Sequence, residues 1–170
     1  YDKMIRRLEH KDAEFMLEWM HDRDTTRAFR FPFEQSTTES VIKFIDDSFT
    51  ESNRHFAVVN EMDEYLGTVS LKNISRVNLS AEYAIVVRGV ARGTGAAKLA
   101  TENVLEYAFD TLKLHRVYLN VLERNERARH FYEKCGFVYE GTFRDAIVLN
   151  GRYESLAWYG IVNDKERDEG

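Results

Sequence analysis

The spacing of apolar residues in the first half of the chain predicts one strand, two helices and then three strands. Residues 4–8 are predicted to form a short first strand. Two helices follow, because apolar residues recur every three or four positions and so share one face. These faces carry Ala13, Met16, Leu17 and Met20 in the first helix, and Val41, Phe44, Ile45 and Phe49 in the second, which begins near residue 38.

The connecting segments of this half are predicted from their polar character. A polar stretch at residues 30–40, with the only proline, Pro32, is expected to be a loop between the two helices. Strands are predicted at residues 56–59, 65–71 and 80–87, with a turn at residues 60–64.

The second half of the chain continues with two strand-linked helices and a hairpin. A helix to about Leu112 follows a glycine-bearing loop, a strand covers residues 115–122, and the next helix runs from near Asn125 to Lys134. The last two strands, residues 137–149 and 152–162, are joined at Asn150-Gly151, which is a strong hairpin signal. The order β-α-α-β-β-β-α-β-α-β-β predicts an α/β (α+β) fold. Its mixed, largely antiparallel sheet should have about seven strands, flanked by about four helices.

Composition limits the class of protein. The 170 residues contain no Pro/Gly-rich linker, so we expect one domain over residues 1–163 and a flexible tail over residues 164–170. The net charge of −5 gives no positive field for nucleic acid. No apolar run approaches the length of a membrane span, and the single cysteine, Cys135, cannot close an intramolecular disulfide. These properties favour a cytoplasmic protein without membrane or nucleic-acid partners.

The junction after residue 87 is the first candidate site. A strand ends there, small residues follow and a helix begins, so free helix-start amides could hold an anion such as a diphosphate, with Arg92 adding positive charge. A Walker loop would need a Gly-Lys-Ser/Thr ending, and a dinucleotide fingerprint would need glycine where Lys98 stands. Taken alone, the segment is equally compatible with a turn that binds nothing.

Three blocks together resemble the GCN5-related N-acetyltransferase (GNAT) superfamily. The segment from Arg92 to Ala97 fits Arg/Gln-x-x-Gly-x-Gly/Ala, the pyrophosphate signature of that family. Residues 125–137 resemble its Asn-x-x-Ala-x-x-x-Tyr-x-x-x-Gly-Phe helix, and residues 66–71 are similar to its third strand. The blocks occur in the family's order, and the resemblance extends from Ile5 to Val162.

The resemblance implies an acetyl-CoA site without a metal ion. The amides of residues 92–97 would hold the diphosphate, a strand segment would pair with the pantetheine arm, and Asn125 would hydrogen-bond the cofactor. The implied cofactor-binding residues are Ile85, Val86, Val87, Arg92, Gly93, Thr94, Gly95, Ala96, Ala97 and Asn125.

Two residues are candidates for catalysis. The resemblance implies that Tyr132 stands close to the sulfur and protonates the leaving thiolate, although an aromatic residue on a helix more often packs in a core. Glu82 is a candidate base or water-organising group, and equally a solvent-facing strand residue. Cys135 as an acyl-enzyme nucleophile is less favoured, because no His and Asn/Asp companions accompany it in sequence.

The acceptor is predicted less sharply. Residues 105–119 and 150–161 resemble the branch with ribosomal-protein alanine, spermidine and nucleotide-linked amino-sugar N-acetyltransferases. Arg23, Arg27 and Arg30 would oppose a polycation, which favours a nucleotide-linked amino sugar as the acceptor. Protein N-termini and polyamines are the alternative acceptors. The competing class of protein is a non-catalytic acyl-CoA-binding module. We expect a monomer or a homodimer.

Overall fold

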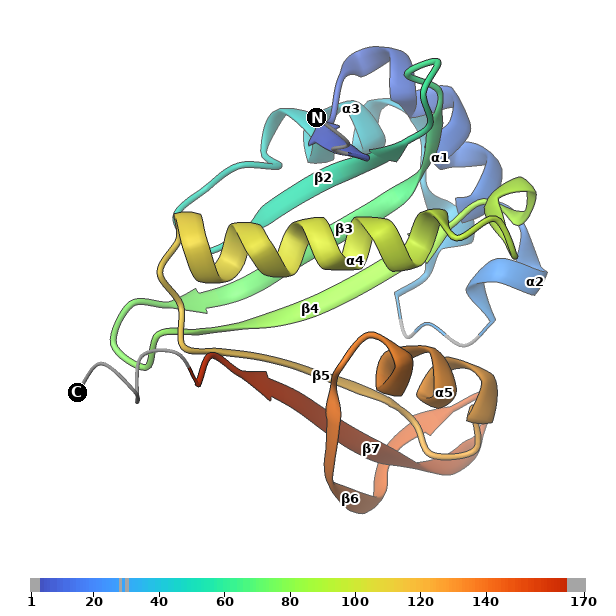
Figure 1. Ribbon diagram of the computed structural model, residues 1–170. Coiled ribbons are helices and arrows are strands. Elements are labelled where there is room, and N and C mark those ends of the chain that lie inside the picture. Colours follow the sequence, from blue (N-terminus) through green and yellow to red (C-terminus); the bar gives the residue numbers. More distant parts are fainter. Residues whose placement is uncertain (1–3, 28, 30, 165–170) are drawn as a thin grey trace.

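The computed structural model describes residues 4–27, 29 and 31–164, and seven strands of this part form one sheet. The strands are β1 (Ile5–Arg7), β2 (Arg54–Val59), β3 (Tyr65–Ser75), β4 (Ser80–Val87), β5 (Arg116–Leu122), β6 (Val138–Leu149) and β7 (Arg152–Val162). The α-helices are α1 (Ala13–Met20), α2 (Arg23–Thr26), α3 (Thr38–Asp46), α4 (Ala96–Glu106), which a π-helical turn continues over Tyr107–Thr111, and α5 (Glu126–Lys134). The predicted element order is confirmed, with α2 as an additional short helix (Figure 1).

The sheet is mixed and largely antiparallel, as predicted. Its strand order is β1-β2-β3-β4-β5-β7-β6, and β4–β5 is the only parallel pair among the strands of the described residues. That pair joins just three residues of each strand, Ser80 to Glu82 on β4 and Arg116 to Tyr118 on β5. The sheet therefore consists of two antiparallel halves held side by side along a short seam.

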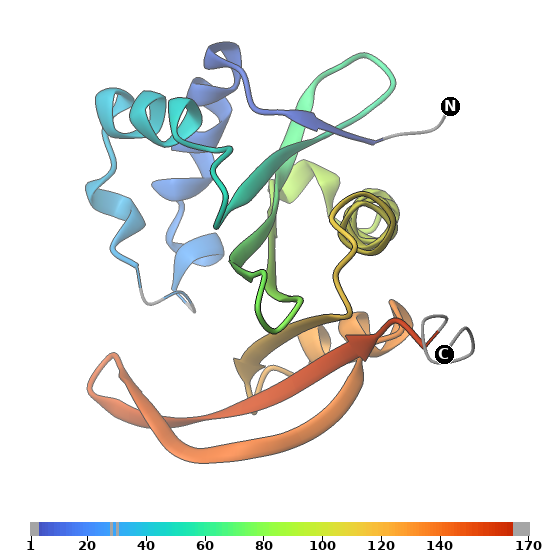
Figure 2. The ribbon, with the colours of Figure 1, turned by 90° about the vertical axis from the view of Figure 1, so that its left-hand side faces the viewer.

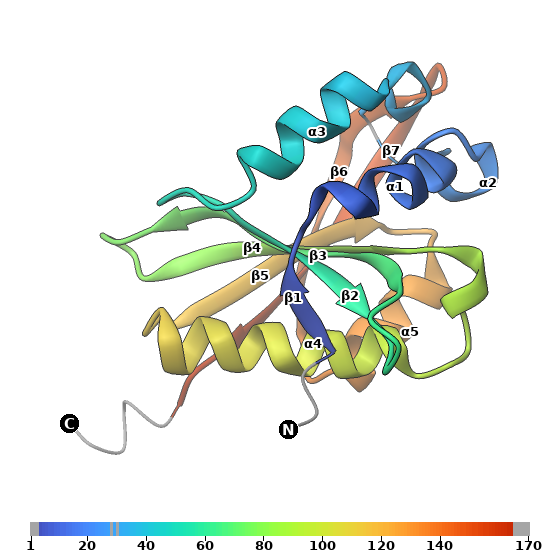
Figure 3. The same ribbon diagram turned by 90° about the horizontal axis from the view of Figure 1, so that it is seen from above.

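Helices cover both faces of the sheet. In Figures 2 and 3, α1, α2 and α3 lie on one side of the β1–β4 half and α4 lies on the other. The α4 face holds the larger core, which includes Tyr83, Val104 and Leu119 and against which Tyr132 of α5 packs. The α1–α3 face holds a second core around Met16, Val41, Trp19, Ala57 and Tyr65.

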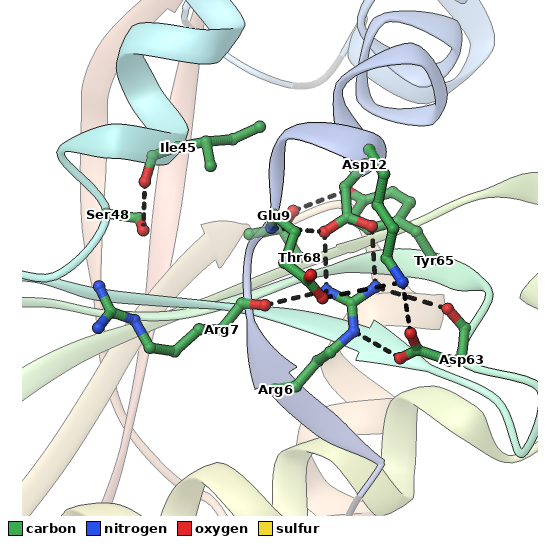
Figure 4. Close-up of polar contacts among 10 residues, drawn as sticks. Arg6, Arg7, Glu9, Asp12, Ile45, Ser48, Asp63, Tyr65 and Thr68 are labelled. Carbon is green, nitrogen blue, oxygen red and sulfur yellow. Dashed lines mark hydrogen bonds and ion pairs between the residues drawn. The ribbon is translucent and has the colours of Figure 1, made fainter.

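An ion-pair network fixes β1 against the α1–α3 layer (Figure 4). Asp12, which is 2% exposed, accepts hydrogen bonds from Arg6 Nη1 and Nη2 at 2.8 and 2.9 Å. Arg6 Nε also donates to Asp63 in the β2–β3 turn at 2.6 Å. One guanidinium thus joins the edge strand, the start of the first helix and a hairpin turn.

Two details of the first half differ from the prediction. Phe49 is not on the face of α3, because the helix ends at Asp46. Phe49 instead forms an isolated β-bridge with Arg54 and packs edge-on against Phe56 at 5.1 Å, so its burial comes from a loop rather than from helical periodicity. The short α2 has only four residues, too few to show a period, and is capped by the Asp22 side chain, which accepts from the Asp24 amide.

Two further predictions concern membrane spans and the C-terminal tail. No helix among residues 4–27, 29 and 31–164 is long and apolar enough to cross a membrane. The predicted tail begins at residue 164, and its residues 165–170 lie outside the described part of the chain.

Candidate active site

The two halves of the sheet separate beyond their short seam. After Glu82 on β4 and Tyr118 on β5, no described strand pairs with residues 83–87 on the side that faces β5. Figure 1 shows β4 and β5 diverging toward the start of α4. Backbone N–H and C=O groups on this side of β4 are therefore available to an extended ligand.

A cleft of about 1040 Å³ occupies the opening between the strands. Glu82 and Tyr132 both line it, and so do Ile85 and Val87 of the open edge. The side chain of Val86 does not line it, since Val86 packs against the α1–α3 core. A Cβ at Gly67 would lie 2.3 Å from the Val86 carbonyl oxygen, so glycine at this position lets β3 approach the end of β4.

The start of α4 forms one end of the cleft. Gly93 and Gly95 have φ values of 76° and 84°, in the left-handed region that glycine adopts without strain. Thr94 Oγ1 accepts from the Ala96 amide at 3.3 Å, while the amides of Gly93, Gly95 and Ala97 have no acceptor among the described residues. Helix-start amides of this kind bind anionic oxygens.

Arg92 stands beside these amides. It lines the cleft, and its Nη2 donates to Thr25 Oγ1 of α2 at 3.2 Å. Its charge has no carboxylate partner among the described residues, so it is available to a phosphate. The Gly93, Gly95 and Ala97 positions line the cleft with it, whereas Thr94 and Ala96 support the turn from behind.

Asn125 is the N-cap of α5. Its side-chain oxygen accepts from the Ala128 amide at 3.2 Å, which satisfies one of the unpaired helix-start donors. Asn125 also lines the cleft. Because the oxygen is used by the cap, the side-chain NH₂ is the group left to contact a ligand.

Tyr132 reaches the cleft from the α4–α5 face. Its ring lies edge-on to Tyr83 at 5.9 Å and to Phe137 at 6.2 Å. Its hydroxyl has no hydrogen-bond partner within the part of the chain that the structure describes. Burial, with a smaller effect of Cys135, raises the pKa of Tyr132 to about 12. The phenol is therefore protonated at neutral pH and can act as a hydrogen-bond donor.

Glu82 reaches the same cleft from the opposite face. Side chains alternate along β4, so Glu82 points away from the side on which its neighbour Tyr83 packs. Its side chain is 22% exposed, with Lys72 Nζ 3.7 Å from one carboxylate oxygen. Asn73 Nδ2 donates to the other at 3.1 Å. The pKa of Tyr118, beside Glu82 in register, is raised by burial and by the Glu82 charge.

Comparison with known proteins identifies the family. The sequence model of the acetyltransferase (GNAT) domain matches residues 4–138. The chain belongs to this family. It is an N-acetyltransferase, and acetyl-CoA is its acetyl donor.

Individual relatives cover almost the whole GNAT chain. The spermidine N(1)-acetyltransferase of Vibrio cholerae serotype O1 is 32% identical over 164 residues, which covers 95% of this chain and 93% of that protein. The putative ribosomal N-acetyltransferase YdaF of Bacillus subtilis is 29% identical over 165 residues, covering 93% of this chain and 90% of that protein.

Solved structures agree with the sequence matches. A crystal structure of the V. cholerae spermidine N-acetyltransferase in complex with CoA and spermine has a TM-score of 0.85 at 29% identity and covers 95% of each chain. A dodecameric structure of the same enzyme has a TM-score of 0.77 at 31% identity, covering 98% of this chain and 96% of that chain. That assembly differs from the monomer or homodimer expected here.

Sequence reasoning missed several residues that line the cleft of this acetyltransferase. Lys98 and Arg127 add positive charge beside the helix starts, and Asn120 faces the opening from β5. Lys98 directly follows the first predicted motif and Arg127 lies within the second, so a search for basic residues in and beside the motifs could have found them. Asn120 has no such signal, because it enters the site only through the separation of β5 from β4.

A second cavity of about 600 Å³ lies between α2 and the β6–β7 hairpin. Arg23, Arg27 and Glu34 line it together with Phe31 and Asn150. It shares Arg27 and Phe29 with the main cleft. Residues of the α2 segment and of the final hairpin thus meet at one end of the cleft.

Proposed function

We propose that this N-acetyltransferase moves the acetyl group directly to a primary amine, with donor and acceptor meeting in the gap between β4 and β5. The observation that carries the proposal is the placement of Glu82 and Tyr132 on opposite faces of the sheet around one cleft. The donor would lie on the α4–α5 face, and the amine would enter from the α1–α3 face.

The donor side would be held mainly by backbone groups. The amides of Gly93, Gly95 and Ala97 with the Arg92 guanidinium would bind the diphosphate. The open edge of β4 at residues 85–87 would pair with the pantetheine amides, and the Asn125 NH₂ would donate to the same arm. These groups fit coenzyme A because they offer donors at one end and an extended edge at the other.

Glu82 would accept the proton that the amine must lose. A primary amine with a pKa near 10.4 is neutral in only about one molecule in 2,500 at pH 7. Glu82, directly or through water, would take this proton so that the nitrogen lone pair can form the C–N bond to the acetyl carbonyl carbon. The C–S bond then breaks, and the electron pair stays on sulfur.

Tyr132 would stabilise the negative charge that develops on the coenzyme A sulfur. The pKa of Tyr132, about 12, lies above the value near 8.5 of an ordinary thiol, so a free phenolate is an unfavourable product. Tyr132 would therefore donate a hydrogen bond to the sulfur as the C–S bond lengthens. When Tyr132 passes its proton to the thiolate, it regains one from solvent, and the proton that the nitrogen still carries leaves to solvent as the amide forms.

Direct transfer is favoured over an acyl-enzyme on Cys135. Burial raises the pKa of the Cys135 thiol, and a protonated thiol is a poor nucleophile. Cys135 also packs against the large core rather than lining the cleft.

For the acceptor we propose a polyamine. The support comes from two spermidine N(1)-acetyltransferases, of V. cholerae at 32% and of Escherichia coli at 33% identity, and from the neighbour in complex with CoA and spermine. Asp24 and Glu82 in the cleft and Glu34 in the second cavity would pair with ammonium groups. The nucleotide-linked amino sugar favoured by the sequence pattern finds no support among these relatives.

A protein N-terminus is the second candidate. Arg23 and Arg27 oppose a polycation, and the putative ribosomal relative has comparable coverage. A thiol-release assay with acetyl-CoA should separate the two candidates. We expect spermidine or spermine to give at least tenfold higher kcat/KM than N-terminal alanine peptides. Thiol release with the peptides alone would refute the polyamine assignment, and no release with any primary amine would refute the proposed transfer to such an amine.

Replacing Arg92 tests the donor site. Arg92→Ala should weaken coenzyme A binding about tenfold, because one charge-assisted contact to phosphate is lost. Calorimetric titration of the protein with coenzyme A measures the effect. Pantetheine, which carries no phosphate, is the control ligand, and its affinity should not change. Equal weakening of both ligands, or of neither, would remove Arg92 from the diphosphate site.

A further inference from the structure

A β-bulge interrupts β3 opposite the candidate base. Lys72 pairs with Glu82 and Ser75 with Ser80, so two residues of β3, Asn73 and Ile74, face the single residue between Ser80 and Glu82 on β4. Asn73 has a φ of 52°, in the left-handed region. This conformation is uncommon for a residue other than glycine, although asparagine tolerates it best.

The bulge changes where the Asn73 side chain lies. In a regular strand, consecutive side chains alternate, so Asn73 would point to the face opposite Lys72. Here Lys72 Nζ lies 3.7 Å from Oε2 of Glu82, and Asn73 Nδ2 donates to Oε1 at 3.1 Å. Two consecutive residues of one strand thus contact the two oxygens of one carboxylate.

The loop before β2 supports this arrangement. The Asn73 amide donates to Asn53 Oδ1 at 3.3 Å, and the Ile74 amide donates to the Ser52 carbonyl at 2.9 Å. The backbone donors released by the bulge are thereby paired. Bulges and left-handed residues often re-aim side chains beside functional groups, at a local cost that the surroundings must offset.

We propose that Asn73 is a positioning residue of the acetyltransferase, which acts by holding the Glu82 carboxylate in its orientation toward the cleft. The inference rests on the proposed role of Glu82 in proton removal. Lys72 alone provides an attraction without a fixed direction, since an ammonium is a point charge. The side-chain amide of Asn73 adds a directed hydrogen bond to one carboxylate oxygen of Glu82. The carboxylate therefore has less freedom to rotate away from the amine.

Asn73→Gly is the sharpest variant, because glycine keeps the left-handed backbone and removes only the amide side chain. We expect kcat with the amine to fall about tenfold, as for loss of a hydrogen bond to a charged group, while the KM for acetyl-CoA stays unchanged. Asn78→Gly, in the turn of the same hairpin, is the matched control and should keep full turnover. Full turnover of Asn73→Gly would overturn the inference.

A double-mutant cycle separates positioning from a general structural effect. In a Glu82→Ala background, Asn73→Gly should change kcat less than twofold, since its target is gone. The same tenfold loss in both backgrounds would show that Asn73 does not act through Glu82. If Glu82→Ala keeps full turnover, the base assignment fails. In that case, crystal structures of the wild type and Asn73→Gly test the positioning role independently of catalysis. A displaced Glu82 carboxylate supports that role, and an unmoved one refutes it.

Discussion

Tyr132→Phe should lower kcat about 100-fold while leaving the KM for acetyl-CoA within twofold. Phenylalanine keeps the ring contacts with Tyr83 and Phe137 and removes only the hydroxyl, which has no partner among the described residues. The loss therefore measures the donor to the departing sulfur, and general-acid groups contribute at least this much. Steady-state kinetics with thiol detection, at saturating amine, would measure it.

Two comparisons make this result interpretable. Tyr153→Phe removes a hydroxyl from a tyrosine that is 71% exposed on β7 and should have no effect on turnover. An acetyl ester with a phenol-like leaving group of low pKa needs little help from an acid, so Tyr132→Phe should slow such a donor much less. Unchanged turnover with acetyl-CoA would show that Tyr132 is a packing residue.

Glu82→Gln should lower kcat/KM for the amine about 100-fold at pH 7, because the variant cannot accept a proton. The deficit should shrink as the pH approaches the amine pKa near 10.4, where a growing fraction of the amine is already neutral. A pH profile of kcat/KM for wild type and variant measures this. Below that pH, the variant should gain close to tenfold in rate per pH unit.

The pH dependence of kcat/KM shows whether Glu82 acts as the base. Glu106→Gln, an exposed α4 residue that does not line the cleft, should follow the wild-type curve throughout. If Glu82→Gln loses the same factor at every pH, Glu82 contributes to binding or structure rather than to proton removal. If it loses nothing, the amine is deprotonated by another group or in solution.

The order of elements was predictable because each long helix and strand buries one regular face. Met16 and Val41 follow helical periodicity into one core, and Val117 and Leu119 follow strand alternation into the other. Phe49 was misplaced because a loop residue can fill a core position at helical spacing by coincidence. Periodicity records which residues are buried, and only the backbone shows how they reach the core.

The donor side of the site was more predictable than the acceptor side. Local motifs encode Gly95 and Asn125, since a left-handed turn and a helix cap each need particular residue types. The positions of Asn120 and Asn73 depend instead on where two strands part and on a bulge. Neither the strand separation nor the bulge has a local signature in the sequence.

The short seam between β4 and β5 leaves few backbone hydrogen bonds between the two halves of the sheet. Three residue pairs join its halves, whereas seven pairs join β5 to β7. Opening the cleft further would therefore break few sheet hydrogen bonds and would be resisted mainly by the larger core, which includes Tyr83 of one half and Leu119 of the other. A ligand that spans the gap would link the two halves, so we expect the sheet to be more rigid with a ligand bound than after the product has left.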